Sequence, residues 1–152
     1  MIKSKKDKKK ERVEHANALL INFSSVGAKF FLHNGGASQF EVDTHGKIWF
    51  LDKCSDRRVY VYREGRWKGF TEGGTLRTLI EALRDYIRTG EKISPRFVVP
   101  AFYSYGDVYG YGVAAIKELM KLSNDNPVFE QRPLELTSYL EEQIKRYSNE
   151  SA

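Results

Sequence analysis

The segment SQFEVDTHGKIWFLDKCSDRRVYVYREGRWKGF, residues 38–70, decides the fold. Its runs SQFEVD and RVYVYR alternate with a period of two residues, which is typical of a strand with one buried face. The short turn sequences THG, CSDR and EG separate four such runs. Parallel neighbours would need longer crossover connections, so this spacing predicts an antiparallel meander. A further apolar run, AKFFLH, precedes the segment and predicts a fifth strand.

Helical patterns flank these strands on both sides. The clearest is TEGGTLRTLIEALRDYIRTG, whose apolar residues repeat at helical spacing: Leu76, Leu79, Ile80, Leu83 and Ile87. Other helices are expected over residues 11–26, over 113–122 and from Pro133 onward. Together these elements predict an α+β fold: an antiparallel sheet of four to five strands, packed helices and a C-terminal helical extension.

The charge of the chain is concentrated at its N-terminus. The net charge is +5, and residues 1–12 alone carry seven basic and two acidic side chains. This segment has almost no apolar content, so residues 1–10 are expected to be a disordered basic tail ahead of a single α+β domain over 11–152. No apolar stretch is long enough to predict a membrane span or a signal peptide. With one cysteine, Cys54, no internal disulfide can form, and a reducing cytosol is the expected location.

A hairpin is predicted at Glu64-Gly65, in a locally cationic part of the chain. Residues 53–96 carry eleven basic and six acidic side chains. Pairing across a two-residue turn places three rings on one strand face, those of Tyr60, Tyr62 and Trp67. The valines and most of the turn cations then occupy the other face. Because aromatic cross-strand pairs stabilise sheets, we expect these rings to belong to the core and to lie on a different face from most of the cations.

Phosphate contacts dominate the affinity of proteins for nucleic acids, so the cations of this region are candidate nucleic-acid-binding residues. They are Arg57, Arg58, Arg63, Arg66 and Lys68. A solvated turn region would carry the same residues. If the helix at 76–89 covered the valine face, the rings would instead form an exposed platform on which single-stranded nucleic acid stacks. The sequence leaves open which sheet face this helix covers.

A second candidate surface is the Tyr/Gly-rich segment 102–112. Tyrosine gives a large contact area at a small entropic cost, so this composition is typical of a protein-binding loop. Its candidate partner-binding residues are Tyr103, Tyr105, Tyr109 and Tyr111. The alternative is a loop that lays these rings over the sheet.

No enzyme motif is recognisable in the chain. Glu41 and Asp43 share a strand face and could hold a divalent metal, but Asp52 and Lys53 point to opposite faces, and no nuclease spacing results. The GGTLR stretch lacks the lysine-serine pair of a phosphate-binding loop, and no Gly-x-Ser-x-Gly elbow is present. We therefore expect no catalytic residue, no metal and no cofactor.

The segments FEVDTHGKIWFLD and GRWKGFTEGGTLRTLIEALRDYIRTG carry a family resemblance. Over roughly residues 16–90 the chain resembles small uncharacterised accessory proteins of bacteriophages and plasmids. The resemblance implies a mobile-element protein in a bacterial cytoplasm that binds nucleic acid or inhibits a host factor.

Three functions follow as hypotheses from these features. The first is a non-enzymatic nucleic-acid-binding accessory protein, with DNA and RNA both open. The second is a protein–protein inhibitor of a host defence factor, and the third is a metal-dependent nuclease. The oligomeric state is not predicted.

Overall fold

A computed structural model describes residues 4–26, 32–33, 36–52, 57–61, 74–99 and 112–151. The helices and strands are α1 (Lys5–Ser25), β1 (Leu32–His33), β2 (Gly36–Ala37), β3 (Gln39–Val42), β4 (Ile48–Asp52), β5 (Arg57–Tyr60), α2 (Gly74–Thr89), α4 (Gly112–Ser123) and α5 (Thr137–Ser151). Two 3₁₀ turns, η2 (Pro95–Phe97) and η3 (Pro133–Leu136), join them. The class is therefore α+β, as predicted.

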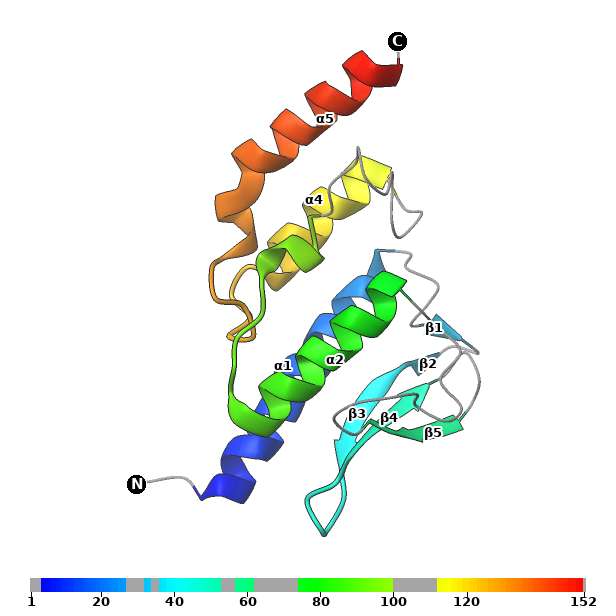
Figure 1. Cartoon of the computed structure of the whole chain (residues 1–152), viewed down its shortest axis with the longest axis vertical. Coiled ribbons are helices and arrows are strands. Elements are labelled where there is room, and N and C mark those ends of the chain that lie inside the picture. The colour runs from blue at the N-terminus through cyan, green and yellow to red at the C-terminus, as the bar shows by residue number, and fades with distance from the viewer. Residues whose placement is uncertain are drawn as a thin grey trace.

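Helix α1 is the element that joins the rest of the structure. It packs against β3, α2 and α4, and in Figure 1 the α1–α2 pair lies beside the strands while α4 and α5 lie away from them. Its buried residues include Leu19, Leu20 and Phe23. They belong to one hydrophobic core with Leu79 and Leu83 of α2 and with residues of the sheet and of α4.

The sheet has three strands in the described part of the chain, in the order β3-β4-β5, all antiparallel. The prediction of four to five strands is therefore not confirmed. Of the run AKFFLH, the structure describes Leu32–His33, which pairs locally with Gly36–Ala37 as a separate two-stranded ladder. The predicted strand at 66–70 and its turn lie outside the described residues.

The helices cover the valine face of the sheet. Phe40 pairs with Phe50, and Phe50 pairs with Val59, so these three side chains share one face. All three are buried in the core together with Ile48 and Val61. Strand alternation then turns Trp49 and Tyr60 to the opposite face. The expectation that Tyr60 is core is wrong, because this ring belongs to the face that the helices leave open and is 38% exposed.

Helix α1 begins at Lys5 and not at Glu11, so residues 5–10 are helical where a disordered tail was expected. Ser4 caps the helix, since its hydroxyl accepts from the Asp7 amide at 3.1 Å. Lys9 Nζ donates to the Gly46 carbonyl at 2.7 Å, and Arg12 Nε donates to the Ile87 carbonyl at 2.9 Å. These tertiary contacts hold a segment that composition alone would leave unfolded.

Asn17 ties α1 to the backbone of β3. Its side-chain oxygen accepts from the Phe40 amide at 2.6 Å, and its Nδ2 donates to the Phe40 carbonyl at 3.0 Å. One amide side chain thus satisfies both backbone groups of a residue in an outer strand. This pair of bonds sets the position of α1 along the sheet.

Helix α2 runs antiparallel to α1, so the first turns of α1 lie beside the last turn of α2 (Figure 1). His15 Nδ1 and the Tyr86 hydroxyl are 2.7 Å apart across this pair, and burial raises the pKa of the Tyr86 phenol. The helix ends at Thr89, followed by Gly90 with a φ of 84°, a conformation that suits glycine after a helix. The contact between α1 and α2 therefore brings basic residues of both helices to the same end of the molecule.

The C-terminal region follows the predicted pattern with one difference. The helix expected over 113–122 is α4, and the helix expected from Pro133 begins as the 3₁₀ turn η3 before α5 starts at Thr137. A short parallel bridge between Ile93 and Phe129 connects this region to the segment after α2.

Candidate nucleic-acid interface

The face of the sheet that the helices leave open carries aromatic and charged side chains. Trp49 is the central residue of one rung, paired with Glu41 on β3 and with Tyr60 on β5. Arg58 pairs with Leu51 in the neighbouring rung of the same face. We call Glu41, Trp49, Arg58 and Tyr60 the outer sheet face. Because alternate residues of a strand share a face, these side chains all lie opposite the core.

The rings and cations of the outer sheet face contact one another. The Trp49 and Tyr60 ring centroids are 5.1 Å apart with a 37° tilt. The Arg58 guanidinium lies 4.0 Å from the Trp49 ring centroid, and the Lys47 ammonium lies 5.4 Å from that of Tyr60. Both distances are within the range of a cation–π interaction. Arg58 and Tyr60 thus place a cation and a ring on the same surface, whereas the cations that were predicted to lie opposite the rings, Arg63, Arg66 and Lys68, lie outside the described residues.

Arg58 is also paired with an acidic residue of the same face. Its NH2 lies 2.6 Å from the Glu41 carboxylate, and both side chains remain more than 40% exposed. An exposed pair of this kind contributes at most about 1 kcal/mol to stability. Its larger effect is on orientation, since Glu41 holds the guanidinium against the Trp49 ring.

Asp43 fixes the turn next to this face and the edge of the Trp49 ring. Its carboxylate accepts from the Trp49 indole at 3.0 Å, from the Lys47 amide at 2.9 Å and from the His45 amide at 2.8 Å. The hydrogen bond from Trp49, followed by that from the Lys47 amide, lowers the pKa of Asp43 from 3.8 to about 2. Asp43 is thus a positioning residue for Trp49.

The lowered pKa of Asp43 predicts acid sensitivity of this turn. Because the folded pKa lies below the unfolded value, the stabilisation by Asp43 is present above pH ~4 and is lost as the pH falls toward 2. In the variant Asp43→Asn we expect the Trp49 indole proton to lose its partner and this part of the pH dependence to disappear. Carboxyl chemical shifts measured by NMR from pH 6 to 1.5 test this directly. Asp125→Asn is the control, because the Asp125 side chain is 88% exposed and its distance to Arg132 is 4.0 Å. An ordinary titration of Asp43 would contradict the assignment.

The lysines of α1 continue the basic surface beyond the sheet. A groove of about 660 Å³ lies between α1 and β3, with Glu41 and Asp43 on its strand side. Its helix side carries four lysines, Lys5, Lys6, Lys9 and Lys10. A neighbouring hollow of about 390 Å³ adds Lys8, Arg12 and Arg88. We call Lys5, Lys6, Lys8, Lys9 and Lys10 the lysine row. Lys9 joins the row to the sheet through its bond to Gly46, directly before Lys47.

The lysine row stands where the helix dipole disfavours it. The N-terminal end of a helix carries a partial positive charge, so cations in the first turns destabilise the helix. Asp7 is the one acidic residue in the first turn of α1. An anion bound along the row would relieve this repulsion.

A family model, YoqU, matches residues 6–151, which is nearly the whole chain. The chain belongs to the YoqU family. Comparisons with curated proteins and with solved structures found no match. Family membership is compatible with the phage-type protein that the sequence resemblance implies.

Only part of the predicted site of this YoqU-family chain falls on described residues. Arg58 lies on the outer sheet face, whereas Arg57 pairs through its backbone with Asp52 and its side chain is not among those described. The remaining predicted residues lie outside the described residues, namely Arg63, Arg66 and Lys68 for nucleic acid and Tyr103, Tyr105, Tyr109 and Tyr111 for a protein partner. The rings of Tyr62 and Trp67 lie outside them as well.

Lys47 and Trp49 belong to this surface but were not among the residues predicted from the sequence. Alternation in KIWFLDK places Lys47 and Trp49 on the face opposite Ile48 and Phe50, but Leu51 shares the Trp49 face, so the pattern alone does not say which face is exposed. Within the residues that the structure describes, no group of three histidine, cysteine or carboxylate side chains could hold a metal ion. In the same part of the chain, no helix is both long and apolar enough to cross a membrane.

Proposed function

We propose that this protein is a non-enzymatic nucleic-acid-binding protein that holds a single strand along the outer sheet face and the lysine row. The observation that supports this most directly is the pair of partly exposed rings, Trp49 and Tyr60, flanked by Arg58 and Lys47. Bases unstack from a single strand and stack on aromatic rings and guanidinium groups, whereas a duplex keeps its bases paired. A sheet that presents rings beside cations therefore suits a single strand.

The lysine row supplies the second half of the proposal. Contacts between lysine side chains and phosphates do not depend on the base sequence. Lys9 of the row is hydrogen-bonded to Gly46, in the turn that carries Lys47. A strand that stacks on Trp49 and Tyr60 can continue past Lys47 to Lys9 and along α1. The two acidic residues on the strand side of this path are engaged with protein groups, Glu41 with Arg58 and Asp43 with Trp49, whereas Asp7 lies among the lysines of α1. We place this function in an accessory protein of a phage or plasmid, acting in the bacterial cytoplasm.

A fluorescence anisotropy titration tests this function. Labelled single strands of DNA and of RNA, each with a 5′-hydroxyl, are titrated between 0.05 and 0.3 M salt together with a duplex of the same sequence. We expect tighter binding to a single strand than to the duplex, and a linear fall of log K with log salt. Trp49→Leu keeps an apolar side chain and removes the ring, and should weaken binding about tenfold, since each stacked base contributes roughly 1–3 kcal/mol.

Tyr139→Leu is the matched control for the ring. Tyr139 also lies beneath an arginine, with the Arg96 guanidinium 4.9 Å from its ring centroid, but it belongs to α5 and lies apart from the outer sheet face. Its replacement should leave binding unchanged. Equal losses in both variants, or binding that salt does not weaken, would contradict the proposal.

A further inference from the structure

A second basic site lies beneath the turn between β3 and β4. It is a half-open cavity of about 210 Å³ lined by residues of the turn, of the end of β5, of the first turns of α1 and of the last turns of α2. Its wall includes Lys9, His45, Lys47, Tyr60, Arg84 and Arg88. None of the described residues that line it carries a carboxylate. The cavity therefore combines four cations from three separate parts of the chain.

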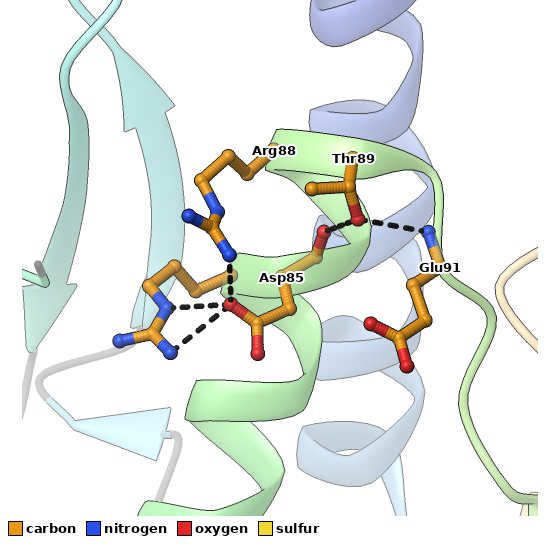
Figure 2. Close-up of polar contacts among 5 residues, drawn as sticks. Asp85, Arg88, Thr89 and Glu91 are labelled. Carbon is orange, nitrogen blue, oxygen red and sulfur yellow. Dashed lines mark hydrogen bonds and ion pairs between the residues drawn. The ribbon is translucent and has the colours of Figure 1, made fainter. Parts of the chain in front are cut away.

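Arg84 and Arg88 are held in place by one carboxylate behind the cavity wall. Asp85 Oδ1 accepts from Arg84 Nε at 3.1 Å and from Arg88 NH2 at 3.4 Å (Figure 2). The Arg84 side chain is only 6% exposed, whereas that of Arg88 is 38% exposed. An arginine that is already desolvated and oriented loses little entropy when it binds an anion.

Lys9 is oriented by the turn itself. Its ammonium donates to the Gly46 carbonyl at 2.7 Å, and Gly46 has a φ of 81°, which glycine adopts without strain. Gly46 and Lys9 both line the cavity. The fourth cation, Lys47, follows Gly46 and lies 5.4 Å from the Tyr60 ring centroid.

Charge and size indicate the ligand. Four cations line the cavity, and the described residues of its wall include no carboxylate; this concentration of positive charge suits a dianion better than the single charge of a phosphodiester. The volume corresponds to about seven water molecules at roughly 30 Å³ each, and it is below the ~300 Å³ at which pockets for whole drug-sized ligands begin. We propose that this cavity binds the phosphoryl group of a phosphate monoester, through Arg84, Arg88, Lys9 and Lys47.

Two sources carry this group: the 5′-terminal phosphate of a nucleic-acid strand and a free nucleoside monophosphate. Tyr60 belongs both to the cavity wall and to the outer sheet face, so a terminal nucleotide could place its phosphate inside and its base against the ring. Recognition of a free monophosphate needs no strand at all. The cavity therefore does not depend on the function proposed for the sheet.

Calorimetry with small ligands is the first test. The full chain is titrated with adenosine 5′-monophosphate, with adenosine and with inorganic phosphate. We expect the monophosphate and inorganic phosphate to bind and adenosine not to bind. Arg88→Gln removes an exposed cavity cation and should weaken monophosphate binding about tenfold, the effect of losing one charge-assisted hydrogen bond of roughly 1.5 kcal/mol.

Arg146→Gln is the matched control, because Arg146 pairs with Glu142 one turn earlier in α5 at 3.1 Å and is 58% exposed. Lys47→Gln provides a second cavity variant, which tests the site even if Arg88→Gln alters the end of α2. If monophosphate binds no better than adenosine, or if neither cavity variant weakens it, the proposal is overturned.

A strand with a 5′-phosphate is then compared with the same strand carrying a 5′-hydroxyl. At least tenfold tighter binding of the phosphorylated strand, lost in Arg88→Gln, identifies the strand end as the source. Monophosphate binding without such a preference identifies the free nucleotide. Because the sheet is tested with 5′-hydroxyl strands, failure of the cavity and failure of the proposed function give different results.

Discussion

The triple variant Lys5→Gln, Lys6→Gln, Lys10→Gln should bind a single strand about 100-fold more weakly than the unchanged chain at 0.1 M salt. Each phosphate contact on a single strand releases about 0.7 of a counterion, which amounts to roughly 0.7 of a decade in affinity at 0.1 M salt. Three lost contacts give about two decades, and the slope of log K against log salt should fall by about 2. Lys9 is left unchanged, because it bonds to Gly46 and also lines the cavity.

The same variant should not be less stable than the unchanged chain. Removing three cations from the first turns of α1 reduces repulsion with the helix dipole, so we expect a small increase in the free energy of unfolding. The matched control is Lys117→Gln, Lys121→Gln, Lys145→Gln, which makes the same change in net charge on exposed positions of α4 and α5. Comparable losses of affinity in the two triple variants would show a general charge effect and would contradict a binding role of the lysine row.

Asn17→Ala should lower the free energy of unfolding by about 3 kcal/mol. The substitution removes both partners of the Phe40 backbone, an N–H and a C=O in a residue that is 3% exposed. Each buried polar group left without a partner costs about 1–3 kcal/mol, and the better helix propensity of alanine offsets roughly 0.5 kcal/mol of this. Urea denaturation followed by circular dichroism measures the difference.

Asn22→Ala on the same helix is the control for this prediction. Its side chain also donates to a backbone carbonyl, that of Leu122, but at 3.3 Å and in an exposed position. Water can replace that bond, so we expect a change below about 0.5 kcal/mol. Similar effects of the two substitutions would mean that Asn17 acts only through the helix and not through the sheet.

The sequence predicts the periodic elements well and the contacts between them poorly. The pattern in RTLIEALRDYI identifies α2, and the alternation in SQFEVD and KIWFLD identifies β3 and β4, because a buried face needs apolar residues at the period of its element. Neither pattern says which sheet face meets the helices. That face is decided by the buried residues Phe50, Val59 and Val61, and it places Tyr60 opposite to the expected side.

The residues that form the basic surface lie far apart in the sequence, so the sequence alone does not show that they come together. Lysines at residues 5–10 have the composition of a disordered tail, and nothing local predicts that they continue a helix. Their order depends on partners far along the chain, Gly46 for Lys9 and Ile87 for Arg12. For the same reason the cavity could not be predicted, since its cations come from α1, from the β3–β4 turn and from α2.

The bonds between Asn17 and Phe40 have a consequence for self-association. An outer strand normally presents unpaired amides and carbonyls that can recruit a strand from another molecule and start aggregation. Here the asparagine side chain occupies the amide and the carbonyl of Phe40, and α1 lies along β3. A single polar residue in a helix thus protects this edge from pairing with another molecule, which matters for a sheet of which the structure describes three strands.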